Sequence, residues 1–151
     1  MKKWHYVIAG ISIMIIILGI SGVMIYRGLH QQKIDTSNNL IHVTYPNPGD
    51  IISSPVTLVG EARGNWYFEA SFPVTIVDWD GLIIGQGHAE AQSDWMTTEY
   101  VPFKATLEFT RPAISDFDKA YANRGAVIFK NDNPSGDPSK DASIEVPVLF
   151  K

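Results

Sequence analysis

The 151-residue sequence contains no cysteine. This absence excludes disulfide bonds, metal sites that use thiolates, a cysteine nucleophile and lipid attachment at a processed N-terminal cysteine. It does not exclude export from the cytoplasm, because oxidising compartments permit disulfides without requiring them. A domain of about 110 residues is also large enough to be stable on its hydrophobic core alone.

Positive charge is scarce in most of the chain. Residues 40–151 contain 8 Lys or Arg against 15 Asp or Glu, and the remaining basic residues lie towards the N-terminus. Proteins that bind nucleic acids gain much of their affinity by neutralising phosphates with a basic surface. We therefore expect no nucleic-acid partner.

Motifs that carry catalysis are also missing. The sequence has neither a G-x-S-x-G nucleophile elbow nor a glycine-rich phosphate loop between a strand and a helix. His42 and His88 are the only histidines after residue 40, and we expect them on different strands. A zinc site needs three or four ligands, so the segment 88–90 (HAE) is predicted to be an ordinary strand end. We predict a protein without enzyme activity, cofactor or metal.

Two acidic or polar patterns raise the question of calcium. The segment 131–136 (NDNPSG) resembles the start of an EF-hand loop, but the twelfth position is Ala142, where a bidentate Glu is required. A second set of carboxylates would have to converge from separate loops and strand ends: Asp78, Asp80, Glu90 and Asp94. Because a turn already accounts for Asp80, we predict no calcium site and keep this set as the alternative.

The most prominent feature that is present is a hydrophobic run near the N-terminus. Val7–Tyr26 is twenty residues long and carries no charge. At about 1.5 Å rise per residue, a helix of this length spans the roughly 30 Å hydrocarbon core of a bilayer. Lysines precede the run, Arg27 follows it and aromatic residues lie at both ends, as is typical of a transmembrane helix.

A cleaved signal peptide is the alternative for this run. Its apolar region is usually only about 7 to 15 residues long, whereas Val23–Tyr26 continue the run past the small residues at which cleavage would occur. We predict a flank in residues 1–6, a single-pass membrane anchor in residues 7–26 and a polar linker in residues 27–39. The flanking positive charges favour a cytoplasmic N-terminus only slightly.

Beyond residue 40 the apolar residues follow a period of two. Phe103, Ala105, Leu107 and Phe109 alternate with polar residues, as in a strand with one buried and one exposed face. Similar apolar patterns predict further strands in residues 41–45, 56–58, 66–72, 74–79, 82–87, 126–131 and 144–150.

Turn signals at short spacing separate these strands. Asp80-Gly81 joins two apolar runs and predicts a hairpin with a tight two-residue turn, because Asp-Gly accommodates positive φ angles. Seven or eight short strands in about 110 residues are typical of a sandwich of two antiparallel sheets. We predict an all-β, immunoglobulin-like domain in residues 40–151.

Large aromatic residues are concentrated between positions 66 and 100. In a sandwich most of them fill the core, and we expect this of three: Phe68, Phe72 and Trp95. Trp66 and Tyr67 follow the turn-like segment that begins at Arg63. An exposed Trp and Tyr beside an Arg make a favourable contact for a protein or a glycan. Arg63, Trp66 and Tyr67 are therefore the candidate interaction surface, with a core position as the alternative for the two aromatic residues.

Several short motifs occur in a fixed order along the domain: Val43-x-x-Pro46, Ser54-Pro55-Val56, Gly60-Glu61-Ala62-Arg63, the segment 68–74 (FEASFPV), Asp78-x-Asp80-Gly81, Asp94-Trp95-Met96, Val101-Pro102-Phe103 and Asn133-Pro134-Ser135-Gly136. Together they resemble the immunoglobulin-like Gmad2 domain of bacterial spore germination proteins. The resemblance covers residues 41–150.

The resemblance implies a bacterial protein with an immunoglobulin-like sandwich in the cell envelope, and it brings no catalytic residues. Behind the predicted anchor, such a domain is expected on the extracytoplasmic side of the cell membrane as a non-catalytic interaction module. The expected partners besides the membrane are an envelope protein or a cell-wall glycan, and the family suggests a link to spore germination or sporulation. The alternative is a structural or accessory subunit of a membrane assembly, in which the helix makes the functional contact.

Overall fold

A computed structural model describes residues 39–111 and 121–151 of the chain. The predicted anchor in residues 7–26 and the flank in residues 1–6 lie outside these ranges, as does the linker apart from its last residue. Within the described ranges, no helix has the length and apolarity needed to cross a bilayer.

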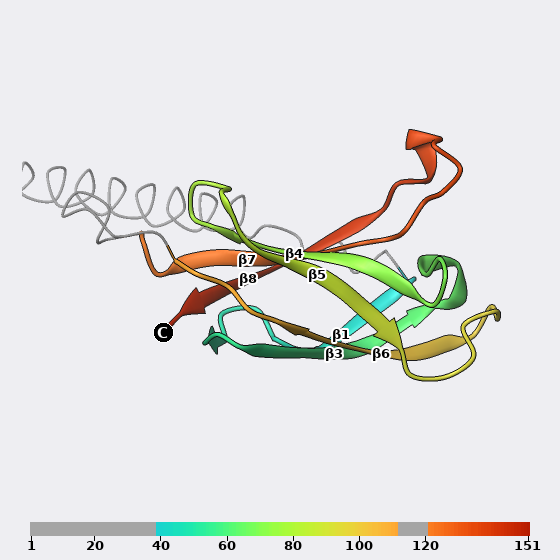
Figure 1. Cartoon of the computed structure of the whole chain (residues 1–151), viewed down its shortest axis with the longest axis horizontal. Coiled ribbons are helices and arrows are strands. Elements are labelled where there is room, and N and C mark those ends of the chain that lie inside the picture. Colours follow the sequence, from blue (N-terminus) through green and yellow to red (C-terminus); the bar gives the residue numbers. More distant parts are fainter. Residues whose placement is uncertain (1–38, 112–120) are drawn as a thin grey trace, which may run out of the picture. The chain divides into compact units, whose positions relative to one another are not determined.

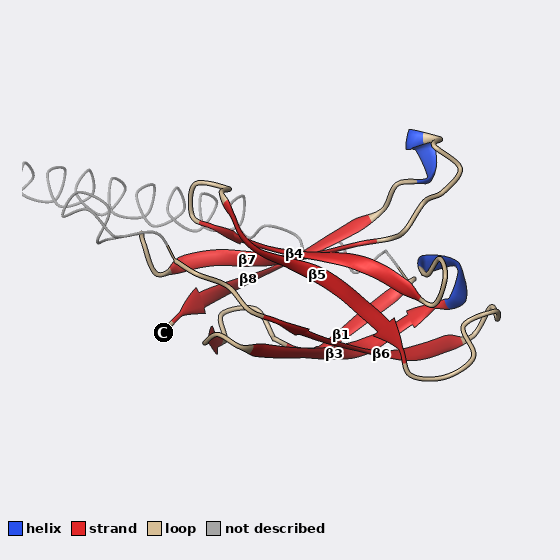
Figure 2. Cartoon of the chain, viewed as in Figure 1, coloured by secondary structure: helices blue, strands red, loops and turns tan. Residues whose placement is uncertain are grey.

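The described part of the chain is built from strands and two short 3-10 helices (Figure 2). The strands are β1 (Ile41–Tyr45), β2 (Ile51–Ile52), β3 (Val56–Arg63), β4 (Ser71–Asp78), β5 (Ile83–Ala91), β6 (Tyr100–Leu107), β7 (Arg124–Lys130) and β8 (Ser143–Phe150). The helices are η1 (Gly64–Trp66) and η2 (Pro138–Lys140). The predicted all-β class is confirmed. The strand predicted in residues 66–72 is wrong over most of its length, because η1 ends at Trp66 and β4 begins only at Ser71.

All eight strands belong to one sheet with the order β1-β3-β6-β5-β4-β7-β8-β2. In Figure 1, β1, β3 and β6 lie in one layer and β4, β7 and β8 lie in the other, with β5 passing between them. The link between β5 and β6 consists of two residue pairs, Glu90 with Lys104 and Ala91 with Phe103. The prediction of two separate sheets is therefore corrected to a single sheet that curls over on itself.

The first part of the domain is shared between the two layers. β1 pairs with β3 at one edge of the sheet, whereas the short β2 pairs with β8 at the other edge. The β2–β8 pairing is parallel, so the predicted antiparallel arrangement does not hold for this pair. The chain thereby crosses from one layer to the other within its first twelve strand and turn residues, Ile41 to Ile52.

The core lies between the two layers and follows from the period-two pattern. Along β4, Phe72, Val74 and Ile76 are buried, while the residues between them are partly exposed. The ring centroid of Phe103 on β6 lies 5.1 Å from that of Phe72 and 5.8 Å from that of Phe129 on β7. Truncating a buried Phe to Ala typically costs about 3–5 kcal/mol. These aromatic contacts hold the curled sheet closed.

The predicted β4–β5 hairpin is confirmed, but its turn is longer than predicted. The Asp78 amide donates to the Leu82 carbonyl (3.0 Å) and the Gly81 amide donates to the Asp78 carbonyl (3.1 Å). These bonds enclose a loop of three residues, Trp79 to Gly81, and Gly81 has φ +82°. Such loops combine a type I turn with a left-handed residue, so only Gly81 needs a positive φ angle.

The register of the strands places Asn39 and Trp79 at opposite ends of the domain. Asn39 lies beside the start of β6, because the Tyr100 hydroxyl donates to its carbonyl oxygen (2.6 Å). β4 starts at this end and leads to the other, where Asp78 pairs with Gly125 at the start of β7. A strand of this length spans about 25 Å. The end that carries Trp79 therefore lies far from the point where the linker enters.

Candidate binding surface

The two aromatic residues of the predicted interaction surface are in the core. Trp66 is 1% exposed and Tyr67 is 3% exposed, so the expectation that both are exposed is wrong. η1 turns the chain back over the domain, and the rings of both residues pack edge-on against Phe72, with centroids 6.3 Å and 5.2 Å away. The segment after Arg63 was expected to be a surface turn, whereas this single helical turn directs its large side chains inward.

Tyr67 combines burial with a specific hydrogen bond. Its hydroxyl donates to the carbonyl oxygen of Val101 on β6 (2.7 Å). Burial raises the pKa of the Tyr67 phenol well above its usual range. Tyr67 therefore ties the β3–β4 connection to the neighbouring strand as a neutral group.

Arg63 lies at the surface, where it contacts residues that the sequence did not suggest. Its guanidinium carbon lies 3.9 Å from the ring centroid of Tyr100, and Nη1 donates to the Thr98 carbonyl (3.0 Å). The ring of His42 stacks on Tyr100 with centroids 4.6 Å apart. The structure thus separates Arg63 from the buried side chains of Trp66 and Tyr67. A role of Arg63 in binding stays a prediction.

The outcome for the predicted core aromatics is mixed. Phe72 is buried and Trp95 packs partly against the core, as expected. Phe68, however, is exposed. It precedes a tight turn at Glu69 and Ala70, and that turn leaves the Phe68 side chain at the surface.

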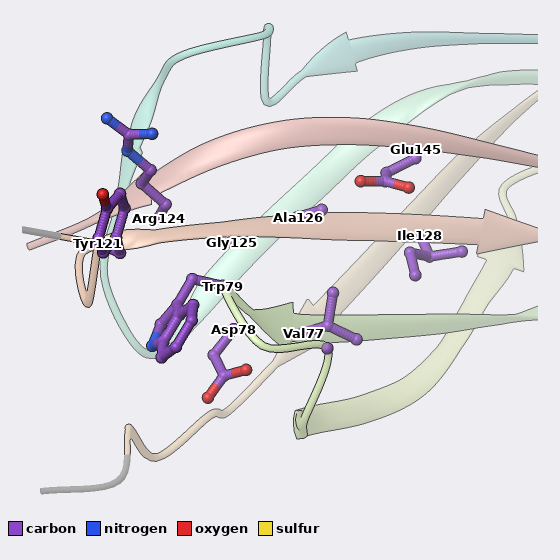
Figure 3. Close-up of a pocket in the computed structure, with 10 residues that line it drawn as sticks. Val77, Asp78, Trp79, Tyr121, Arg124, Gly125, Ala126, Ile128 and Glu145 are labelled. Atoms are coloured by element: carbon purple, nitrogen blue, oxygen red, sulfur yellow. The ribbon is translucent and has the colours of Figure 1, made fainter. Parts of the chain in front are cut away.

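An exposed aromatic pair lies at the opposite end of the domain from Asn39. Trp79 in the β4–β5 turn is 45% exposed, and Tyr121 before β7 is 52% exposed. Their ring centroids are 6.1 Å apart and the ring planes are inclined by 36°. Figure 3 shows the two side chains next to each other, with Arg124 beside Tyr121. The guanidinium carbon of Arg124 lies 5.5 Å from the Tyr121 ring centroid.

The backbone around Trp79 is held by one buried carboxylate. Asp78 Oδ1 accepts hydrogen bonds from the amides of Asp80 (3.0 Å) and Leu82 (2.9 Å). Such a bond pattern makes the side chain part of the turn. The period of two directs Asp78 inward and Trp79 outward, so the tryptophan is presented at the tip of the hairpin.

The other half of the surface is positioned by β7. The Arg124 amide donates to the Tyr121 carbonyl (2.8 Å), which closes a turn directly before the strand. Gly125 follows, and a Cβ atom at this position would clash with the Val77 carbonyl oxygen and the ring of Phe150. Glycine is needed here for the close approach of β7 to β4, and this approach brings Tyr121 towards Trp79.

These residues line a cavity of about 490 Å³ on the outer face of β4, β7 and β8. Its floor is formed by Val77, Ala126 and Ile128, and Glu145 on β8 lies beyond Ile128 (Figure 3). Volumes of this size are typical of sites for small ligands. We refer to Trp79, Tyr121, Arg124 and Glu145 as the aromatic cavity. These four residues supply two aromatic faces, one cation and one carboxylate. Asp78 also lines the cavity, but its Oδ1 already accepts the two amides of the turn.

No group of three or more His, Asp or Glu side chains that could hold a metal ion occurs among the residues that the structure describes. The four carboxylates Asp78, Asp80, Glu90 and Asp94 therefore do not converge within the described residues.

In the β7–β8 loop, the Asn133 amide donates to Asp141 Oδ1 (2.8 Å), and Asn131 Oδ1 accepts from the Ala142 amide (2.7 Å). The hydrogen bond from Asn133 lowers the pKa of Asp141, and the charge of the nearby Lys130 lowers it to a lesser extent. The polar side chains of this loop thus stabilise the loop itself.

The sequence contains a signal that Trp79 is exposed at the tip of a hairpin, but no signal that the other residues of the aromatic cavity lie near it. Alternation along β4 places Trp79 on the face opposite Phe72, Val74 and Ile76, and the turn residues that follow make it the tip of a hairpin. Tyr121 and Glu145 lie 42 and 66 positions away from Trp79 in the sequence, and only the pairing of β4, β7 and β8 brings them near it.

The chain was compared with known families and proteins. A model of the Gmad2 family, described as the immunoglobulin-like domain of bacterial spore germination, matches residues 40–118, which is more than half of the chain. The match contains β1 to β6 and Trp79, and it ends before β7 and β8. A search of curated proteins found no match. The chain therefore belongs to the Gmad2 family of immunoglobulin-like domains.

Proposed function

We propose that the protein is a non-catalytic interaction module of the bacterial cell envelope. In this proposal residues 7–26 anchor it in the cell membrane, the domain lies on the extracytoplasmic side, and the aromatic cavity contacts a component of the envelope. Membership in a family of immunoglobulin-like domains supports binding rather than catalysis, and the family description supports a link to spore germination. The hydrophobic run Val7–Tyr26 supports the anchor.

The observation that carries the proposal is the position of the exposed pair Trp79 and Tyr121. Aromatic residues and Arg are enriched among the residues that dominate binding energy, and Trp79, Tyr121 and Arg124 adjoin in one patch. The patch and Asn39 lie at opposite ends of the strands, and a strand of the length of β4 spans about 25 Å. The patch therefore lies at the other end of the domain from Asn39, the first residue that the structure describes.

The first test is chemical cross-linking in intact cells that produce the full chain. We expect the wild type to form cross-linked products with envelope components, and Trp79→Ala to lose most of them. Phe68→Ala is the matched control, because it also removes an exposed aromatic ring but lies at the other end of the domain. Equal cross-linking by all three proteins would contradict a role for the cavity.

A second experiment separates the domain from its anchor. Replacing residues 1–26 with an unrelated single-pass helix should preserve the cross-linked products and any phenotype of the wild-type protein. Loss of both with a correctly inserted replacement helix would instead favour the accessory-subunit alternative, in which the helix makes the functional contact.

A further inference from the structure

We propose that the aromatic cavity binds an uncharged glycan, with sugar rings packed on Trp79 and Tyr121. This inference rests on the proposed function and specifies its ligand class. It follows from three properties of the cavity: the exposed ring faces, the two signs of charge and the position of the aromatic pair at the ends of strands that are paired on both sides.

The ring faces suit the apolar side of a sugar. One face of a pyranose ring presents C–H groups, and these pack favourably against the electron-rich face of an aromatic ring. Trp79 and Tyr121 are each about half exposed, with planes inclined by 36°. Two exposed rings 6.1 Å apart offer a ring-shaped ligand two aromatic contacts at one site, whereas a single exposed aromatic residue would offer one.

The charges around the cavity favour an uncharged ligand with many hydroxyl groups. Arg124 supplies only donors, and Glu145 in its ionised form supplies only acceptors. An anionic ligand would be attracted by Arg124 but repelled by Glu145 and the acidic domain, and a cationic ligand would meet Arg124. A sugar hydroxyl both donates and accepts, so one neutral glycan can satisfy both side chains.

The cavity also differs from the usual sites for peptide strands. Peptides commonly bind as an added strand at the edge of a sheet. Trp79, Tyr121 and Arg124 lie instead at the ends of β4 and β7, and both of these strands are paired on each side. Glu145 lies on β8, whose other side pairs with β2 only at Leu149 and Phe150. The exposed apolar residues Leu82 and Ile83 on the β4–β5 hairpin do not line the cavity. They provide controls that separate a sugar site from a general apolar contact.

The test uses the purified full chain in a detergent without a sugar headgroup. It is titrated with N-acetylglucosamine tetrasaccharide, with maltotetraose and with the anionic oligosaccharide tetragalacturonic acid, and binding is followed by calorimetry and tryptophan fluorescence. We expect at least one neutral oligosaccharide to bind and the anionic one to bind more weakly. Trp79→Ala should weaken binding by about tenfold or more. Leu82→Ser should leave it unchanged.

Several results would overturn the glycan proposal. These are an absence of binding by both neutral oligosaccharides at millimolar concentration, preferential binding of the anionic one, or equal losses for Trp79→Ala and Leu82→Ser. If Trp79→Ala alters the circular dichroism spectrum, Glu145→Ala serves as the second variant because it removes the acceptor, and unchanged affinity would then count against the proposal. Cross-linking to a protein through Trp79 without glycan binding would retain the interaction module and reject its glycan ligand.

Discussion

At the scale of single residues, Tyr67 shows how a side chain expected at the surface becomes part of the core. Its ring packs on Phe72 while its hydroxyl reaches the Val101 carbonyl. A buried phenol is tolerated because its polar atom has a partner. The same burial makes the protonation state of Tyr67 matter for folding.

We predict that Tyr67→Phe lowers the free energy of unfolding by about 1–2 kcal/mol at neutral pH, because the Val101 carbonyl loses its donor. The pKa of Tyr67 is raised in the folded state. Its stabilising contribution is therefore fully present below the unfolded-state pKa of about 10 and is lost as pH rises towards the folded-state pKa. Urea unfolding at several alkaline pH values should show a decline in stability that is steeper for the wild type than for Tyr67→Phe.

The control for this experiment is Tyr121→Phe, which also removes one phenol hydroxyl but does so at an exposed residue. Its pH dependence should follow the wild type. An identical alkaline decline for Tyr67→Phe and the wild type would show that Tyr67 does not couple to folding.

A second prediction concerns the turn between η1 and β4. Glu69 and Ala70 have φ angles of +48° and +63°, a region that costs a residue with a Cβ about 1–2 kcal/mol. We expect Ala70→Gly to raise the free energy of unfolding by about 0.5–1 kcal/mol, because relief of this strain exceeds the added chain entropy of glycine. Ala142→Gly, at a residue outside the positive-φ region, should lower stability instead. Chemical denaturation measures both, and a loss of stability for Ala70→Gly would contradict the argument.

At the scale of elements, the β4–β5 hairpin connects the fold to the proposed binding site. Its turn holds Trp79 through the bonds of the Asp78 carboxylate to the amides of Asp80 and Leu82. Asp78 is 9% exposed, and its carboxylate gives both amides a local partner within the turn.

We predict that Asp78→Ala lowers the free energy of unfolding by about 1–3 kcal/mol and increases hydrogen exchange at Asp80 and Leu82, because two donors lose their acceptor. Asp78→Asn keeps an oxygen at the Oδ1 position and should stay within about 1 kcal/mol of the wild type. NMR-detected exchange resolves the individual amides. If Asp78→Ala left both amides as protected as in the wild type, the carboxylate would have no role in holding the turn.

The sequence was a good guide to elements and a poor guide to their long-range pairing. The alternation in β4, β6 and β8 and the Asp80-Gly81 signal arise from local periodicity, so the strands and the hairpin were predictable. The pairing of β2 with β8 joins segments nearly 100 residues apart and leaves no period in the sequence. For the same reason the burial of Trp66 could not be decided, since it depends on where η1 directs the chain.

At the scale of the whole described domain, the curled sheet joins a segment that matches the Gmad2 family model, up to residue 118, to a segment beyond the end of that match. Trp79 lies inside the segment that matches Gmad2, whereas Tyr121, Arg124 and Glu145 lie beyond its end. The β4–β5 hairpin that carries Trp79 therefore lies within the matched segment. The other three residues of the aromatic cavity lie on β7, on β8 and in the turn before β7, outside the matched segment.

The position of Asn39 and Trp79 at opposite ends of the strands also has a mechanical consequence. A pull between these two points acts nearly parallel to β3 and β4, while the hydrogen bonds of the sheet run across the strands. Under such a load the bonds of a strand pair are sheared together instead of being opened one after another. Tension applied through a bound ligand would therefore be distributed over all hydrogen bonds of a strand pair. We expect the domain to resist tension along its strands.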